Sequence, residues 1–354
     1  MRAIYVTEFA ERGNLAFTTE APKPQLDPSS NDLLVRVLAC ALNPGDCRLM
    51  SGSVSLVMKP TAFPYIPGID LCGVVEAVGA KCSPLGKFKV GDRIVASQDA
   101  FTHGSFAEYV LINSTRATLA PPKSVCSDLE AASLPVAGCT AIQALKDARV
   151  GPGSRVLVIG GSGGVGSLVV QLAKLKGAAF VAATSTNTEL VGSLGVDLAI
   201  NYREANWWDV LKREEQDDDQ RLDAIIDCVG DAASWRHCDD HVLKKRGGRY
   251  IAVVDAPDTQ VRTIGDLFKF IGPMLWRSWN PFTTSYTMVS SFPKTKELEE
   301  LVALVSTYSK QQLRAVLDAT SPYELTLESM ERAVALQMSQ RAKGKLVFRV
   351  SDAK

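Results

Sequence analysis

The stretch RVLVIGGSGGVGSLVVQLAKLKG at residues 155–177 gives the strongest structural signal in this chain. An apolar run typical of a buried strand leads into a glycine-rich turn, and an amphipathic helix follows. The turn matches G-x-G-x-x-G through Gly161, Gly163 and Gly166, and G-x-x-G-x-x-G through Gly160, Gly163 and Gly166. Such glycines let the backbone approach a pyrophosphate, which free N–H groups at the positive end of the helix then hold.

The turn predicts a dinucleotide site, because a strand precedes it, a helix follows it and further strand–helix repeats come after it. The residues that we expect to bind the phosphates are contiguous: Gly160, Gly161, Ser162, Gly163, Gly164, Val165 and Gly166. The alternative interpretation is a tight turn that binds no ligand.

The second strand of this unit ends at Ala183–Asn187, which contains no acidic residue. Sites for NAD usually have an Asp or Glu there, which accepts a hydrogen bond from the ribose 2′-hydroxyl. Small hydroxyl and amide groups suit a phosphate instead. We therefore predict NADPH as the cofactor, with Ser185, Thr186 and Asn187 beside its 2′-phosphate and Tyr202 as a further contact. Thr186 or Asn187 would also suit a helix N-cap, which is compatible with phosphate binding.

Changes of sequence pattern along the chain predict two domains, one of them formed by both ends of the chain. Residues 1–121 are rich in β-branched residues, Gly and Pro, which indicates a partly open β-barrel. Strand-like and helical runs alternate over residues 122–310, which indicates an α/β fold with a doubly wound parallel sheet. Residues 311–354 are expected to return to the first domain, with a strand at 313–319, a helix and a final strand. Within the second domain, residues 255–284 show no readable pattern.

The composition excludes several classes of partner. Lys and Arg balance Asp and Glu at 39 each, so no overall charge attracts nucleic acid or an anionic membrane. No apolar run is long enough to span a bilayer. The eight cysteines are scattered without a C-x-x-C pair, and we expect them to be reduced. The first residues are typical of a strand rather than a leader. We expect a cytoplasmic protein, or a mitochondrial one if a leader has been removed.

A second set of motifs covers nearly the whole chain. In order, besides the glycine turn, they are Ala41–Asp46, Phe63–Asp70, Gly73–Val75, Val78-Gly79, Gly91–Arg93 with Val95, Gly104–Tyr109, Leu134–Ala141, Asp227–Gly230 and Arg341–Lys345. Together they resemble the medium-chain dehydrogenases/reductases of the zinc-free quinone-oxidoreductase type. The segment before residue 285 and the Asp227–Gly230 motif look closest to the reticulon-interacting branch. The resemblance implies a GroES-like barrel, a Rossmann domain, and hydride transfer from NADPH in the cleft between them.

The resemblance also implies two candidate catalytic residues. It places Asn43 beside the nicotinamide or the substrate oxygen, although Asn43 also suits a turn before Pro44. Arg48 stands where quinone reductases of this type often have a tyrosine, which puts their substrate preference in question. Arg48 would either hold the developing charge of an enolate or hydroquinone or lie on the surface.

Four further residues are expected at the cofactor. Thr140 would lie near the nicotinamide, Val229 and Gly230 end the fourth strand of the parallel sheet, and Lys345 would lie by the phosphates. Each also has a simple packing or turn interpretation. Asp46 and Asp70 match the family pattern too, and we interpret them as mainly structural.

No metal site is expected. Ile69 stands where zinc-dependent members of the family have a histidine ligand, and the lobe that holds their structural zinc is missing after the strand at 92–97. His237 and His241, four apart on an expected helix, are interpreted as a solvated face. The acidic run at 214–220 is interpreted as a solvated loop.

The sequence leaves three functions open. The first is an NADPH-dependent enzyme that reduces a small-molecule electron acceptor, a quinone or an activated alkene, without zinc. The second is an enoyl-thioester reductase of fatty-acid or polyketide synthesis, and the third is an NADPH-binding interaction protein without turnover. We also expect a homodimer, because residues 285–292 are typical of an apolar edge strand that could pair with a second copy.

Overall fold

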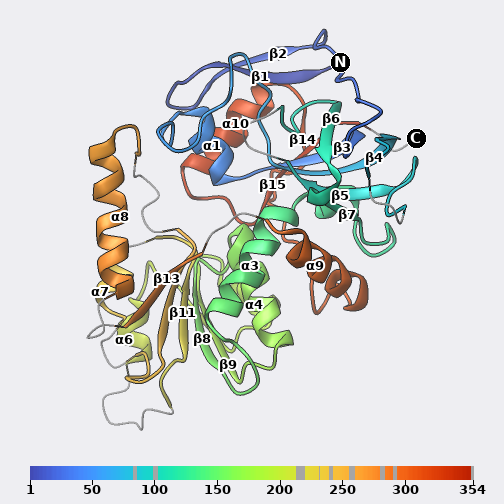
Figure 1. Ribbon diagram of the computed structural model, residues 1–354. Helices are drawn as coiled ribbons and strands as arrows, with labels where there is room; N and C mark the ends of the chain where they lie inside the picture. The colour runs from blue at the N-terminus through green and yellow to red at the C-terminus, as the bar shows by residue number, and fades with distance from the viewer. Residues whose placement is uncertain are drawn as a thin grey trace.

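The computed structural model describes residues 1–82, 86–98, 103–212, 220–230, 232–238, 242–254, 260–279, 284–289 and 293–351. It contains two large sheets, one above the other in Figure 1. Both ends of the chain lie at the upper sheet, and the middle of the chain forms the lower one.

The lower sheet has six parallel strands in the order β10-β9-β8-β11-β12-β13. Counted along the chain, this is the 3-2-1-4-5-6 order of dinucleotide-binding sheets. The predicted Rossmann sheet is thereby confirmed. Its strands are β8 Arg155–Ile159, β9 Phe180–Thr184, β10 Leu198–Ile200, β11 Ala224–Asp227, β12 Arg249–Ala252 and β13 Ser285–Met288.

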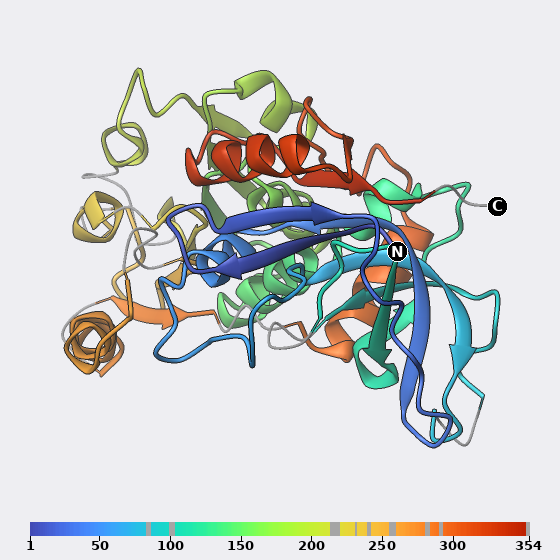
Figure 2. The same cartoon turned by 90° about the horizontal axis from the view of Figure 1, so that it is seen from above.

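Helices cover both faces of this sheet, because its central strands are apolar on both faces. Val156 and Val158 of β8 belong to the core shared with α3, α4, α5 and α9, while Leu157 and Ile159 belong to the core on the other face, with α6 and α7. Figure 2 shows the two helix layers on opposite sides of the sheet. The helices are α3 Pro135–Asp147, α4 Gly164–Leu175, α5 Thr188–Ser193, α6 Trp207–Leu211, α7 Ala232–Arg236, α8 Ile264–Trp279 and α9 Thr295–Thr307.

The upper sheet has the order β14-β15-β3-β4-β5-β7, with β6 beside β3 and a separate pair, β1 and β2. The last strand pairs antiparallel with β3, Leu346 opposite Leu42, so the two ends of the chain share one sheet. The domain limits at 121 and 310 stay a prediction. The strands are β1 Ala3–Glu8, β2 Asn14–Thr18, β3 Asp32–Leu42, β4 Asp70–Val78, β5 Arg93–Ser97, β6 Tyr109–Asn113, β7 Ala117–Leu119, β14 Tyr323–Glu324 and β15 Leu346–Arg349, and the helices are α1 Pro44–Met50, α2 Asp128–Ala132 and α10 Leu327–Met338, with a 3₁₀ turn at Ser114–Arg116.

The strand expected at 313–319 does not form. An isolated bridge joins Leu317 to Lys345, and the backbone of Arg314 is hydrogen-bonded by a side chain instead. The amide of Gln171 on α4 accepts from the Arg314 N–H at 2.8 Å and donates to its carbonyl at 3.0 Å. One side-chain amide thus takes the place of a neighbouring strand.

Residues 255–284, which showed no readable pattern, contain α8 in their described part. None of the helices in the described ranges is long and apolar enough to cross a membrane.

Candidate functional site

The turn between β8 and α4 has a backbone geometry that only glycine permits at three of its positions. Gly160 has a φ of +80°, a left-handed conformation that favours glycine. A β-carbon on Gly166 would collide with the carbonyl oxygen of Gly160, and one on Gly161 would lie 2.7 Å from the β-carbon of Ala183. Gly163 is the N-cap of α4. The first N–H groups of α4, which have no hydrogen-bond partner within the helix, therefore lie at a turn that consists mainly of glycine.

The end of β9 lies against this turn. Ser185 is buried, and its hydroxyl donates to the Ser162 hydroxyl at 2.8 Å and accepts from the Asn187 N–H at 2.8 Å. Asn187 is also the N-cap of α5, because its side-chain oxygen accepts from the Leu190 N–H. Thr186 is half-buried, and Tyr202 is exposed beyond the end of β10. The structure brings Ser162 and Ser185 together and shows the N-cap role of Asn187.

The end of β11 forms the neighbouring edge of the turn. A β-carbon on Gly160 would lie 2.7 Å from the Val229 side chain, so these two residues are in contact. One carboxylate oxygen of Asp227 accepts from the N–H groups of Val229 and Gly230, at 2.8 and 2.9 Å. Its other oxygen accepts from the Tyr250 hydroxyl at 2.6 Å. Asp227 therefore fixes the backbone where ligands bind in open parallel sheets.

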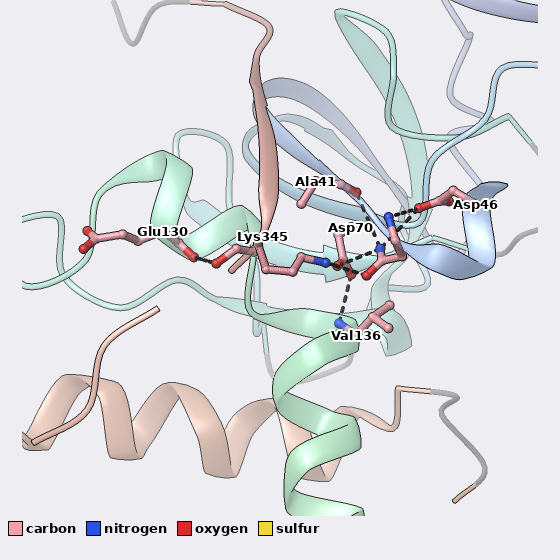
Figure 3. Close-up of polar contacts among 8 residues, drawn as sticks. Ala41, Asp46, Asp70, Glu130, Val136 and Lys345 are labelled. Carbon is pink, nitrogen blue, oxygen red and sulfur yellow. Dashed lines mark hydrogen bonds and ion pairs between the residues drawn. The ribbon is translucent and has the colours of Figure 1, made fainter. Parts of the chain in front are cut away.

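Lys345 connects the glycine turn to the other domain. Its aliphatic chain packs on Gly164, where a β-carbon would lie 2.8 Å from it, and its neighbour Gly344 forms a backbone bridge with Gly163. Its buried ammonium donates to the Asn43 side-chain oxygen at 2.5 Å and to Asp70 at 3.2 Å. Figure 3 shows the Lys345 side chain pointing at Asp70. Only the stem of Lys345 lies at the expected phosphate site; the charge is turned to the upper domain.

The amide of Asn43 is held by the protein on both sides. Its oxygen faces Lys345, which can only donate, and its nitrogen donates to Asp70 at 3.0 Å and to Asp46 at 3.2 Å. The N–H of Asn43 also donates to Asp46 at 2.8 Å, as in an N-cap of α1. The amide orientation is thus fixed, and both of its hydrogens have acceptors within the protein. Direct contact of Asn43 with a nicotinamide or substrate stays a prediction.

Asp46 and Asp70 form one cluster with Asn43 and Lys345, which we call the Asn43 cluster. Sequence patterns did not identify these two acidic residues as site residues. Asp70 also accepts from the Val136 N–H at the start of α3 at 2.9 Å (Figure 3). Burial raises the pKa of Asp70, while Lys345 and Asn43 oppose that rise. Burial raises the pKa of Asp46 to about 7, and its second oxygen has no hydrogen-bond partner among the described residues. The signal that could have found them is their place in the two family motifs beside Asn43 and Ile69.

Thr140 and Arg48 lie on the helices that carry this cluster. Thr140 is buried on α3, one turn after Val136, and its hydroxyl has no hydrogen-bond partner among the described residues. Arg48 is half-buried on α1, and burial lowers its pKa. Both residues therefore lie on helices whose first turns contribute to the Asn43 cluster.

No metal-binding set is found in the part of the chain that the structure describes, where no three His, Cys, Asp or Glu side chains converge. His237 stacks on Trp208 with ring centroids 4.3 Å apart. Its expected companion His241 lies outside the described residues, as do residues 214–219 of the acidic run.

Comparison with known proteins gives the same picture over the whole chain. Residues 29–122 match the alcohol dehydrogenase GroES-like domain, and residues 194–348 match the zinc-binding dehydrogenase family. The chain is 34% identical to the quinone oxidoreductase of Mus musculus over 256 residues, 72% of this chain and 73% of that protein. It is 30% identical to a chloroplastic quinone oxidoreductase of Triphysaria versicolor over 356 residues, 98% of each. The solved structure of the quinone oxidoreductase from Coxiella burnetii matches with a TM-score of 0.76 at 28% identity, over 99% of each chain.

The two sheets and the glycine turn between β8 and α4 define a medium-chain dehydrogenase/reductase. Within this superfamily, the chain belongs to the quinone-oxidoreductase-like group, which the sequence motifs indicated. It is an oxidoreductase of the class that uses a nicotinamide cofactor.

Proposed function

We propose that this protein is an NADPH-dependent reductase of quinones or activated alkenes. The observation that carries the proposal is the contact of Lys345 with both halves of the site. Its stem packs on Gly164 of the glycine turn, and its ammonium fixes Asn43 and Asp70. A cofactor whose phosphates lie on the turn would therefore extend towards the Asn43 cluster of the other domain.

The residues present fit a bound dinucleotide. Glycine lets the chain turn tightly here, because β-carbons on Gly160, Gly161 or Gly166 would lie within 2.7 Å of neighbouring protein atoms, and the positive end of α4 begins at this turn, where it can receive the phosphates. The Thr140 hydroxyl, buried and without a partner among the described residues, suits a hydrogen bond to the nicotinamide amide. When bound, the nicotinamide supplies a hydride to the electron-poor carbon of the acceptor or to the quinone.

The preference for NADPH over NADH is part of the proposal. Neither the end of β9 nor the residues up to Asn187 contain a carboxylate that would accept from a 2′-hydroxyl and repel a 2′-phosphate. Ser185, Thr186 and Asn187 supply neutral donors instead, with Tyr202 as a further contact. Two or three neutral hydrogen bonds of about 1 kcal/mol each would give roughly a ten- to several-hundredfold preference.

In this proposal the Asn43 cluster is the electrostatic part of the site. Lys345 and the N–H of Val136 hold the Asp70 carboxylate, and Asp70 and Asp46 hold the amide of Asn43. Asp46, with a pKa of about 7, is the member that changes its protonation state near neutral pH. The remaining polar group, Arg48, would act on charge that develops on an acceptor oxygen.

Steady-state oxidation of NADPH against a panel of quinones, enones, enals and enoyl-CoA thioesters tests the proposal. Turnover with quinones or enones, well above that with enoyl thioesters, is the expected result. Fastest turnover with enoyl thioesters would favour the second function that the sequence left open. Binding of NADPH without turnover of any acceptor would favour the third.

Reaction without zinc and assembly as a homodimer are also proposals. Ile69 cannot ligate zinc, so elemental analysis of the active protein should find no stoichiometric zinc; one zinc per chain, lost together with activity, would overturn this. A dimer would form at the outer edge of β13, and a monomer by light scattering at micromolar concentration would count against it. A cytoplasmic location belongs to the same proposal.

A further inference from the structure

The helix α8 exposes an apolar stripe along its whole length. Its large apolar residues are exposed at 66% for Ile264, 73% for Phe268, 46% for Leu275, 71% for Trp276 and 83% for Trp279, and none of its residues is buried. The side of α8 that meets the sheet contacts β13. Figure 1 shows α8 on the outside of the molecule, beyond β13.

The stripe continues onto the upper domain through the segment before α8. The Val261 N–H donates to the Ser53 carbonyl at 2.5 Å, and the Val261 carbonyl accepts from the Leu56 N–H at 3.2 Å. Leu56 and its neighbour Val57 are exposed. The loop that contains them directly follows α1, the helix of Arg48 with Asn43 as its N-cap.

Two exposed aromatic rings adjoin this loop. A β-carbon on Gly52 would lie 2.6 Å from the Phe9 ring, and the Phe63 ring packs against Phe9 with centroids 4.9 Å apart. We call the nine side chains together the apolar face: Phe9, Leu56, Val57, Phe63, Ile264, Phe268, Leu275, Trp276 and Trp279. It holds nine of the 14 large apolar side chains that are exposed in the described ranges, so this clustering marks an interaction surface.

Lys269, next to Phe268, is the exposed cation of α8. The segment from Arg262 to Trp279 also contains Arg262, Arg277 and one acid, Asp266, but Arg262 donates to the Ser51 carbonyl and Arg277 lies over the rings of Trp235 and Tyr286. Asp266 accepts from the N–H and hydroxyl of Thr263 and so caps the start of the helix. The chain as a whole is neutral, so any attraction to an anionic partner is local to α8.

We propose that the apolar face docks on an anionic lipid bilayer surface, with α8 lying in the plane of the interface. An interfacial helix has Trp, Phe and Leu on one face and Lys or Arg beside them, and α8 exposes such a face with Lys269 next to Phe268. Its surface is that of a single projecting helix, which suits the soft interface of a bilayer. Indole rings prefer the headgroup level, and Trp276 and Trp279 are the exposed ones among the five tryptophans of the chain.

Such docking has a chemical reason that rests on the proposed function. Quinones and long-chain alkenals dissolve in bilayers. The loop of Leu56 and Val57 follows α1, the helix that Asn43 caps, and is hydrogen-bonded to the segment that precedes α8. A bilayer against the apolar face would therefore present a lipophilic acceptor next to the candidate site. The docking itself requires neither NADPH nor an acceptor, so it can be tested apart from the enzymatic activity.

Vesicle binding of the full chain tests the proposal. The probes are vesicles of phosphatidylcholine alone and of phosphatidylcholine with phosphatidylglycerol, and the readouts are co-sedimentation and tryptophan emission. The protein should bind the anionic vesicles with a blue shift in emission. Replacement of both exposed tryptophans, Trp276→Ser with Trp279→Ser, should lower the partition coefficient by about a hundredfold. Val90→Ser with Met338→Ser, which removes two exposed apolar side chains elsewhere, should leave binding unchanged.

A charge variant provides a second test. Lys269→Gln should weaken binding to the anionic vesicles by about fivefold and leave the weaker binding to phosphatidylcholine unchanged. No binding to anionic vesicles, or equal binding of the wild type and the double tryptophan variant, would overturn the proposal. So would dissociation of a dimer by the tryptophan substitutions, because the apolar face would then be covered by a second copy of the chain.

Discussion

The Lys345–Asp70 pair allows a quantitative prediction for the Lys345→Met variant. Methionine keeps an apolar stem against Gly164 and removes the ammonium from a pair whose side chains are 8% and 0% exposed. Removal of one partner from a buried ion pair costs about 3–5 kcal/mol, because the other charge stays buried and uncompensated. Asp70 retains hydrogen bonds from Asn43 and Val136, which favours the lower end of that range. We expect a loss of about 3 kcal/mol in the free energy of unfolding at pH 8.

The pH dependence of this loss has a defined sign. Burial already raises the pKa of Asp70, and the loss of Lys345 removes the largest influence that lowers it. A carboxyl group with a raised pKa in the folded state stabilises the fold at low pH, and this contribution is lost as the pH rises through the folded pKa. The deficit of Lys345→Met relative to the wild type should therefore be largest at pH 8 and shrink to about 1 kcal/mol at pH 4, where the Asn43 hydrogen bond is still missing.

Urea unfolding at both pH values measures this, with two control variants. Lys343→Met removes an exposed lysine two residues away and should change stability by less than about 0.5 kcal/mol. Lys345→Met combined with Asp70→Asn removes both charges of the pair and should recover more than half of the loss at pH 8. A Lys345→Met variant as stable as Lys343→Met at pH 8, or a deficit independent of pH, would refute the argument.

Two further substitutions test other parts of the site. Asp46→Asn removes a buried carboxyl group whose pKa rises to about 7, and such a group destabilises the fold as the pH rises from about 4 to 7. In urea unfolding, the free energy of unfolding of the variant should therefore increase by roughly 2–4 kcal/mol relative to that of the wild type between pH 5 and pH 8. If the difference between the two proteins does not change with pH, Asp46 ionises with an ordinary pKa. Ser185→Asp places a carboxylate beside Ser162 and should reduce the ratio of NADPH to NADH affinity, measured by calorimetric titration, at least about tenfold. The control variant Ser193→Asp, on the exposed side of α5, should leave this ratio unchanged. Equal ratios in the two variants would exclude the end of β9 as the 2′-phosphate site.

The glycine turn was predictable from sequence because its causes are local. The left-handed φ of Gly160 and the close approach of Gly166 to the Gly160 carbonyl both involve residues a few positions apart. The parallel sheet followed from the alternation of apolar and helical runs, whereas the order of its strands is known from the structure. These features depend on the backbone and on hydrophobic periodicity, which a sequence displays directly.

The Lys345 contacts could not be predicted in the same way. Lys345 is 302 residues from Asn43 and 275 from Asp70 in the chain, and sequence patterns alone do not show which way a flexible ammonium turns. The missing strand at 313–319 has a similar cause, since Gln171, 143 residues away, binds the Arg314 backbone with its side chain. The periodicity argument assumes that a helix buries its apolar residues in a core. The apolar stripe of α8 is exposed, so this argument did not identify the helix.

Hydride transfer from NADPH to a small acceptor can be followed with NADPH deuterated at C4 of the nicotinamide. The purified protein is incubated with this cofactor, deuterated on one face at a time, and an enone, and the product is examined by mass spectrometry and NMR. We expect one deuterium at the β-carbon of the reduced product, from one face of the cofactor only. Tight binding of NADPH with no deuterium in any product would show that the protein does not catalyse this transfer.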